Sequence, residues 1–336
     1  MSLEVQWTRS DLPGSGVAQG YPVLDKAVLD SSGRLHVISN SSSSVHYRRH
    51  DADTGDVQAA TNSASGWGAP PYPAIFASPD GQYVLVVGRS SSSNYPRLLF
   101  SSDGGGTFST STPWTFASGY FAQAIYVGSG VFLLAIGANA GPSRVYTVNV
   151  TTGATSLIYT APSTTRWTGA GLVQTDTGFT MYEGINLDNV CRIHESSDGL
   201  SGWEHTATVT TGQFSHYTRG EHAWGETAGL VRDSVVSGAT ATSLSGAHTM
   251  RNYRGELIYA DAGSGEIRAV DSGLSERVLL SGLGAFGTIS AFGTSVLLLP
   301  YLAADNSGQM AFLAEAEAVA VSVFGGMNAL GRRLVT

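Results

Sequence analysis

The densest group of titratable side chains in this sequence is HYTRGEHAWGET, residues 216–227. It contains two carboxylates, Glu221 and Glu226, and a glycoside hydrolase needs two carboxylates about 5 to 10 Å apart that flank the sugar. If the stretch is a strand, however, Arg219 and Glu221 share one face and can form an ion pair. We expect the ion pair and assign no catalytic residue, with Glu221 and Glu226 as the catalytic alternative.

The residue pattern gives little support to metal or cofactor chemistry. The stretch HDADTGD brings Asp51, Asp53 and Asp56 close together, but the distal glutamate of a calcium loop is absent, so we interpret it as a hairpin turn. Cys191 is the single cysteine, which excludes an intramolecular disulfide, and no cysteine or histidine cluster has zinc spacing. No phosphate loop or nucleophile elbow is present. We therefore expect neither a metal nor a cofactor.

Aromatic side chains recur along the chain at positions that favour sugar binding. Rings with polar edges stack on the C–H faces of sugars while nearby polar groups bind the hydroxyls. An aromatic residue stands at the start of most of the repeating units described below, and two arginines accompany them. The predicted ligand-binding residues are Tyr72, Tyr120, Arg166, Trp167, Tyr217 and Arg219. The alternative is that these rings, like Trp67 and Trp114 in the same loops, fill the space between adjacent sheets.

These candidates follow a repeat in which a turn glycine comes before a short apolar strand. Glycine accepts the positive φ angle that two-residue hairpin turns require. The glycines that fit the pattern are Gly33, Gly81, Gly130, Gly178, Gly229, Gly255 and Gly293. Their successive intervals are 48, 49, 48, 51, 26 and 38 residues. An interval near fifty accommodates four short strands with their turns, and the unit after Gly229 is short.

A four-stranded antiparallel meander cannot bury its faces alone, and radial stacking of copies solves this problem. We therefore predict an all-β fold, a single β-propeller of four-stranded antiparallel blades. Seven blades fit the glycine count, and six are the alternative if the short unit at 217–245 is an insertion. Residues 4–9 resemble the outer strands, so we expect this N-terminal strand to close the last blade, with 318–323 as a competing candidate. The predicted domains are 1–324, the propeller, and 325–336, a C-terminal docking tail.

Two segments resemble the Asp box, the pattern Ser-x-Asp-x-Gly-x-x-aromatic of sialidase-like propellers. The first contains Ser101, Asp103, Gly105 and Phe108, and the second contains Ser196, Asp198 and Trp203, with Leu200 in the glycine position. The resemblance implies a structural role at the turn between the third and fourth strands of a blade. There the aspartate accepts backbone N–H bonds and the ring packs between neighbouring sheets. We expect neither aspartate to be catalytic.

The likeness to sialidases does not extend to their catalytic residues. That family holds a carboxylate with three arginines, for which Arg166, Arg219 and Arg251 are the candidates. The arginine motif of the first blade is replaced by YPVLDKAV. Tyr182 and Glu183 are adjacent, so alternation along a strand points them to opposite faces. We therefore do not expect sialidase activity.

Charge and hydropathy narrow the classes of partner. The formal net charge is −8 with 18 Lys and Arg residues, so the dense basic surface that binds nucleic acid is missing. No apolar run reaches the roughly 18 to 20 residues that span a bilayer, and the start MSLE does not match a signal peptide. We expect no nucleic-acid partner, no membrane insertion and no export signal.

The composition, rich in Ser, Thr and Gly with Lys26 as the single lysine, and the run AEAEAVAVSV are similar to those of bacteriophage virion proteins, especially tail-tip or fibre-associated propellers. This resemblance implies a non-enzymatic structural and binding propeller, made in the host cytoplasm and located in the virion. Its tail would contact other virion proteins and its aromatic face a host-surface glycan. The alternatives are a glycoside hydrolase-type propeller acting on surface polysaccharide and a purely structural scaffold.

Overall fold

In the part of the chain that the computed structural model describes, every regular element is a β-strand. Between residues 215 and 253 the description covers the backbone of the strands. Glycine, serine and threonine dominate the turns, as the composition predicts. The described residues are 3–9, 27–41, 44–65, 67, 73–93, 95–115, 118–138, 140–162, 164, 166, 168–185, 190–210, 215–217, 222–225, 229–232, 240–242, 247–253, 256–261, 265–270, 275–282, 286–292, 295–300 and 310–315.

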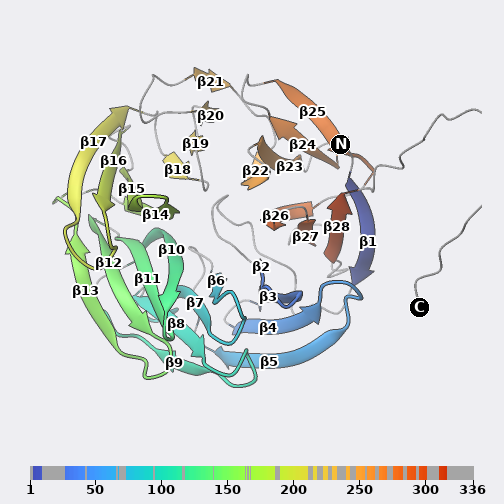
Figure 1. The fold of residues 1–336 in the computed structure, drawn as a ribbon, viewed down its shortest axis with the longest axis horizontal. Helices are drawn as coiled ribbons and strands as arrows, with labels where there is room; N and C mark the ends of the chain where they lie inside the picture. The colour runs from blue at the N-terminus through green and yellow to red at the C-terminus, as the bar shows by residue number, and fades with distance from the viewer. Residues whose placement is uncertain are drawn as a thin grey trace, which may run out of the picture.

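These strands form seven four-stranded antiparallel sheets. Figure 1 shows the sheets side by side around a central axis, with the strands of each sheet stepping outward from the axis to the rim. The chain is therefore an all-β propeller, as predicted, and each sheet is called a blade below. Blade 1 is β2 (Ala27–Leu29), β3 (Arg34–Ser41), β4 (Ser44–Asp51) and β5 (Val57–Ser65); blade 2 is β6 (Ala74–Ala77), β7 (Val84–Arg89), β8 (Pro96–Ser101) and β9 (Ser109–Ser111); blade 3 is β10 (Ser118–Gly128), β11 (Val131–Ala138), β12 (Gly141–Asn149) and β13 (Thr155–Thr160). Blade 4 is β14 (Thr168–Thr175), β15 (Gly178–Ile185), β16 (Val190–Ser196) and β17 (Glu204–Thr210); blade 5 is β18 (Ser215–Tyr217), β19 (His222–Gly225), β20 (Gly229–Arg232) and β21 (Thr240–Thr242); blade 6 is β22 (Ala247–Tyr253), β23 (Glu256–Asp261), β24 (Glu266–Val270) and β25 (Glu276–Leu280).

Blade 7 joins segments from the two ends of the chain. It contains β26 (Phe286–Phe292), β27 (Ser295–Pro300), β28 (Met310–Glu315) and, outermost, β1 (Leu3–Arg9). β1 and β28 are antiparallel, with Leu3 opposite Glu315. The prediction that the N-terminal strand closes the last blade is confirmed, and backbone hydrogen bonds complete the ring. The competing segment 318–323 lies outside the described residues.

Trp7 of β1 anchors blade 7 on blade 1. Its indole Nε1 donates a hydrogen bond of 2.6 Å to the carbonyl of Ala52. The ring stacks on Phe312 with centroids 5.3 Å apart, and it lies so close to Gly55 that a Cβ there would come within 2.7 Å of it. The ring closure is therefore held by side-chain packing as well as by the strand ladder.

The core consists of layers between neighbouring blades, and β7 shows why. Residues 84–87 of this strand, VLVV, are apolar without interruption because both faces of the strand are buried. Val84 and Val86 belong to the cluster shared with blade 1, whereas Leu85 and Val87 belong to the cluster shared with blade 3. The same pattern places Leu133 and Met181 between blades 3 and 4. Blades 1 to 4 thus cover one another, which is the solution that the repeat predicts.

The predicted turn glycines lead into the second strand in most blades, but Gly229 is an exception. In blades 1 to 4 the φ angles are 73° at Gly33, 64° at Gly81, 74° at Gly130 and 153° at Gly178. Gly229, in contrast, begins the third strand of blade 5, opposite Gly225 in the second. The prediction for Gly229 was wrong because a glycine marks a turn without marking which turn of the blade. Blade 5 is a sheet of four short strands.

The predicted docking tail, 325–336, lies outside the described residues. Within the part of the chain that is described, no helix combines the length and the apolar character needed to cross a bilayer.

Candidate functional site

The loops that lead into the innermost strands define one face of the ring, called the entrance face below. Arg166 lies there, just before β14, with an exposed side chain. Its carbonyl accepts a hydrogen bond of 3.0 Å from the amide of Gly141, in blade 3. Among the other predicted ligand-binding residues, Tyr120 and Tyr217 lie in β10 and β18 with undescribed side chains, and Tyr72, Trp167 and Arg219 lie outside the described residues. The predicted ligand-binding set therefore stays a prediction, and Arg166 is the member of that set whose side chain the structure describes.

Thr168 fixes the backbone that carries Arg166. Its hydroxyl donates to the carbonyl of Gly141 at 2.9 Å and accepts from the amide of Ala138 at 2.9 Å. The chains approach so closely that a Cβ on Gly137 would lie 2.0 Å from the carbonyl oxygen of Thr168. Blades 3 and 4 are thus joined at the entrance face two residues after Arg166.

Trp67 and Trp114 do not contribute to an open aromatic rim. Trp67 is 2% exposed, and the guanidinium of Arg97 lies 5.2 Å from its ring centroid. Trp114 is 8% exposed, with its ring centroid 4.5 Å from that of Tyr146. For these two residues the alternative interpretation, rings that fill the space between strands, describes the structure.

The titratable stretch of blade 5 does not form one strand. Tyr217 is the last residue of the innermost strand β18, so it does not precede that strand as expected. Residues 218–221, which include Arg219 and Glu221, link β18 to β19, and Glu226 follows β19. Arg219, Glu221 and Glu226 themselves lie outside the described residues, so both the ion pair and the alternative carboxylate pair stay predictions.

The first of the two Asp-box-like segments forms the turn between β8 and β9. One oxygen of Asp103 accepts from the hydroxyl of Ser101 at 2.7 Å and from the amide of Thr107 at 2.9 Å. Gly105 has a φ angle of 84°, and a Cβ there would lie 2.3 Å from the Tyr47 ring. Phe108 meets the same ring edge-on at 4.9 Å. The turn of blade 2 therefore packs directly on blade 1.

The second segment forms the turn between β16 and β17 with a different hydrogen-bond pattern. Asp198 accepts from the amides of Leu200 and Ser201, both at 2.8 Å. The left-handed positions are Gly199 and Gly202, with φ angles of 73° and 61°. Leu200 is thus tolerated because the backbone at that position is not left-handed. The ring of Trp203 stacks on Tyr159 of blade 3 at 5.9 Å.

The two turn aspartates stay ionised because of these bonds. For Asp103, desolvation raises the pKa, but hydrogen bonds from Ser101 and Thr107 outweigh it and lower the pKa to about 2. For Asp198, hydrogen bonds from the side chain and amide of Ser201 lower the pKa to about 2. Both carboxylates are occupied within their own turns, so neither is free to act as an acid or base.

A buried polar chain that the sequence analysis missed links blades 1 and 2. His36 Nε2 lies 3.1 Å from Asp30 Oδ2, and His36 Nδ1 lies 2.7 Å from the hydroxyl of Tyr47. The same hydroxyl donates to the carbonyl of Gly104 in blade 2 at 3.2 Å. Arg34 Nε also donates to Asp30, at 2.6 Å. Asp30 is 5% exposed, while His36 and Tyr47 are fully buried. The chain therefore serves the contact between blades.

A similar chain links blades 3 and 4 around Glu183. The amide of Ser143 donates to Glu183 Oε1 at 2.7 Å, across the blade interface. Arg192 Nη1 and His194 Nε2 lie 3.4 and 3.6 Å from Glu183 Oε2, and His194 Nδ1 is 3.0 Å from the Tyr159 hydroxyl. Glu183 and His194 are fully buried. The expected alternation of Tyr182 and Glu183 thus places Glu183 inside a blade interface.

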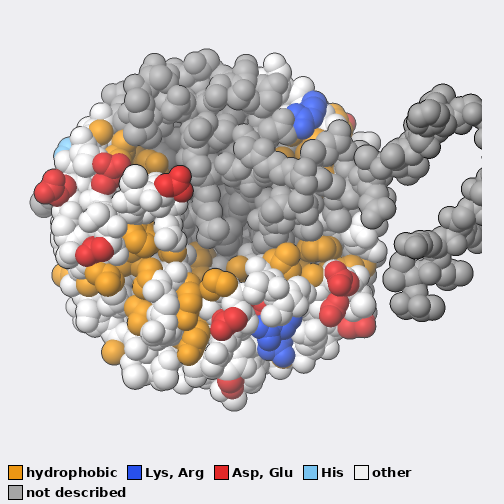
Figure 2. All heavy atoms as spheres, in the orientation of Figure 1, with side chains coloured by type: hydrophobic (Ala, Val, Ile, Leu, Met, Phe, Trp, Pro, Cys, Tyr) orange, Lys and Arg blue, Asp and Glu red, His pale blue; other side chains and the backbone are white. Residues whose placement is uncertain are grey.

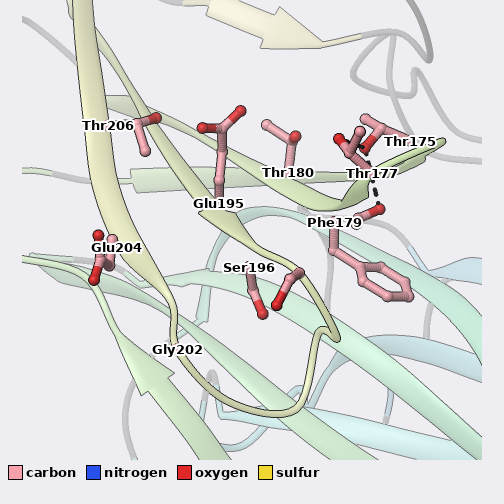
Figure 3. A pocket seen from close by; sticks show the side chains of 11 residues that line it. Thr175, Thr177, Phe179, Thr180, Glu195, Ser196, Gly202, Glu204 and Thr206 are labelled. Carbon is pink, nitrogen blue, oxygen red and sulfur yellow. Dashed lines mark hydrogen bonds between the residues drawn. The ribbon is translucent and has the colours of Figure 1, made fainter.

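A groove of about 390 Å³ opens on blade 4, at the end of the sheet opposite the entrance face. It lies between the turn that joins β14 to β15 and the turn that joins β16 to β17, and it is called the blade-4 groove below. Figure 3 shows Thr180, Glu195 and Thr206 projecting from adjacent strands to the same side. Its lining residues are Thr175, Thr177, Gly178, Phe179, Thr180, Glu195, Ser196, Ser197, Gly202, Glu204 and Thr206. The groove is polar and acidic.

The remaining charged groups are dispersed. Asp51 accepts from the amides of Asp53 and Thr54 at 3.0 Å each, which makes its segment a hairpin turn. Among the described residues no group of three or more His, Cys, Asp or Glu is placed to hold a metal ion. On the face seen in Figure 2, the Arg side chains of the described residues form small isolated groups among scattered acidic ones.

Comparisons with known proteins bear on the fold alone. No protein-family model matches the sequence, and no curated protein matches it. Among solved structures, a catalytically inactive virginiamycin B lyase from Staphylococcus aureus superposes with a TM-score of 0.61 at 11% identity, over 94% of this chain and 99% of the lyase. The Dos1 propeller gives 0.55 at 11% identity over 93% and 95% of the two chains. BamB from Moraxella catarrhalis gives 0.52 at 12% identity over 93% and 100%. At such identities the likeness shows that this chain has the propeller fold.

Proposed function

We propose that this chain is a non-enzymatic binding and assembly propeller of a bacteriophage virion, located at the tail tip or associated with a fibre. Its partners are other virion proteins, contacted through the tail 325–336, and a host-surface glycan. The composition and the two Asp-box-like turns support this proposal, because both resemble virion and sialidase-like propellers. The solved propellers of similar fold include both lyases and other classes of protein, so fold alone does not choose between them.

The observation that carries a binding function is the use made of the acid and base groups. Asp30, His36, Glu183 and His194 are all at most 5% exposed and face other blades. A catalytic acid or base must reach a proton on the substrate at about 2.6 to 3.2 Å. These four groups stabilise the ring instead of facing an open surface, so they are not available to a substrate.

A glycan array with the purified chain, followed by hydrolysis assays on every hit, tests the function. We expect binding without release of product. Hydrolysis that is lost in Glu221→Gln would support the glycoside hydrolase alternative instead. If the chain neither binds nor hydrolyses any glycan, the structural scaffold is the alternative that fits. Arg166→Ala tests the entrance face, where we expect weaker binding, and thermal unfolding shows whether the variant keeps its fold.

Truncation after Phe324 tests assembly separately. We expect the truncated chain to fold, since the described strands end at Glu315, and to be missing from particles assembled in its presence. Incorporation equal to that of the full chain would remove the docking role of the tail without affecting the glycan proposal.

A further inference from the structure

The blade-4 groove is lined by a threonine whose hydroxyl group has no hydrogen-bond partner among the described residues. Thr180 is 5% exposed, yet its side chain lines the groove and is directed into it (Figure 3). Within the described part of the chain, no hydrogen bond is made by this hydroxyl. A hydroxyl group that opens into a groove without a partner in the protein can donate one hydrogen bond and accept others. Thr180 is therefore placed to bond something that enters the groove.

The groove also contains two carboxylates at paired positions of neighbouring strands. Glu195 of β16 and Glu204 of β17 are direct cross-strand partners, and both are exposed. Like charges in this position destabilise a sheet. Neither carboxylate has a hydrogen bond or an ion pair with any other described residue. A ligand that donates hydrogen bonds or carries positive charge would relieve their repulsion.

The rest of the lining limits the chemistry of the ligand. The described lining residues include no Lys, Arg or His, and Thr175, Thr177 and Thr206 add further hydroxyls. A carboxylate, sulfate or phosphate would meet two negative charges and no cation. A ligand rich in hydroxyl groups, in contrast, can donate to the carboxylates and exchange bonds with the threonines. The volume of about 390 Å³ is at the low end of the range of ligand pockets, roughly 300 to 1,000 Å³.

We propose that the blade-4 groove binds a neutral or amine-bearing sugar unit of a glycan, with Glu195, Glu204 and Thr180 as its main hydrogen-bonding residues. The inference rests on the proposed glycan-binding function and assigns that function a site and a charge preference. The site lies at the opposite end of β14 from Arg166, so it is separate from the predicted aromatic rim.

The test is an array of neutral, amino-sugar and sialylated glycans, followed by calorimetric titration of the strongest hit. The test variants are Glu195→Gln, Glu204→Gln and Thr180→Val. Asp176→Asn is the matched control, because Asp176 is an exposed acid in the adjacent turn that does not line the groove. Arg166→Ala, which the proposed function expects to weaken binding at the entrance face, tells whether the hit binds there instead of in the groove. Thermal unfolding of each variant shows whether the fold is retained.

We expect hits confined to neutral and amino-sugar glycans, with affinity reduced about tenfold or more in Glu195→Gln, as for loss of a charged hydrogen bond, and unchanged in Asp176→Asn. Normal affinity in both glutamate variants, or a preference for sialylated glycans, would show that the blade-4 groove is not the sugar-binding site. Either result would leave the proposed glycan-binding function in place. Absence of any hit for the unaltered chain would overturn both.

Discussion

Single glycines determine how closely successive blades approach. At the turn between the third and fourth strands of blades 1 to 4, a left-handed glycine lies against a side chain of the preceding blade. The pairs are Gly55 with Trp7, Gly105 with Tyr47, Gly153 with Phe100 and Gly199 with Leu133. In each pair an added Cβ would come within 3.0 Å of that side chain. These glycines therefore meet two demands at once, a positive φ angle and a close contact.

The two demands can be separated by substitution. Gly105→Ala should lower the free energy of unfolding by more than Gly33→Ala, because both glycines have positive φ but the space around Gly33 is empty to 4 Å. The backbone cost alone is about 1 to 3 kcal/mol, and the clash with Tyr47 adds to it. Urea unfolding of both variants checks this, and equal losses would show that the contact is unimportant.

The Asp30–His36–Tyr47 chain makes stability depend on pH. Burial lowers the pKa of His36, although Asp30 opposes the shift. Desolvation raises the pKa of Asp30, but hydrogen bonds from His36 and Arg34 outweigh it, and the pKa falls to about 2. As pH falls below about 6.5, the unfolded chain protonates His36 while the folded chain does not, so stability decreases. The contribution of Asp30 is retained until the pH falls below about 4 and is lost near 2.

His36→Gln should therefore flatten the pH dependence of unfolding between pH 6.5 and 5. One proton corresponds to at most about 1.4 kcal/mol per pH unit. Chemical unfolding at several pH values measures the slope, with His205→Gln, a change at an exposed histidine, as the matched control. A slope in His36→Gln as steep as in the unaltered chain would show that His36 is not responsible.

At the scale of elements, the sequence predicted which segments form strands better than it predicted the position of each strand in its blade. The apolar run 84–87 indicates a strand buried on both faces, and the turn glycines before it mark its start. Gly229 was assigned to the wrong turn because blade 5 has short strands and turns of similar composition. Closure by β1 was predictable because residues 4–9 resemble other outer strands and the last unit lacked a fourth.

The site could be predicted only in part. Asp103 and Asp198 have a local pattern, since their partners lie within a few residues. Glu183, in contrast, meets Ser143 across a blade interface forty residues away, and no local pattern signals such a contact. The opposition of Glu195 and Glu204 depends on the register of β16 and β17, which the turn length determines.

The closing strand gives a prediction at the same scale. Trp7→Ala removes the bond to Ala52 and the stack on Phe312, and should lower the free energy of unfolding by about 3 kcal/mol. Thr8→Ala, a change at an exposed neighbour in β1, should have little effect. Denaturant unfolding of the two variants gives the comparison, and similar midpoints would mean that the strand ladder alone holds the ring closed.

For the whole molecule, the ring closes where the ends of the described strands meet. Leu3 is the partner of Glu315 in the antiparallel ladder of β1 and β28, so the two residues lie about 5 Å apart. A hairpin turn of two residues joins strands in this arrangement, and Asn-Gly favours it. A two-residue turn is therefore long enough to connect Glu315 to Leu3.

A circular permutant can exploit this geometry. Glu315 is joined to Leu3 by Asn-Gly, and new ends are opened between Ser92 and Ser93, in the turn between β7 and β8 of blade 2. The permutant should fold, because cuts in surface turns are tolerated. It should also lose less stability from Trp7→Ala than the linear chain truncated after Glu315, since β1 can no longer detach at a free end. Calorimetric melting is measured for the permutant and for the truncated linear chain, each with and without Trp7→Ala. A permutant that fails to melt cooperatively, or an equal loss of stability from Trp7→Ala in both chains, would mean that ring closure does not limit the stability of this propeller.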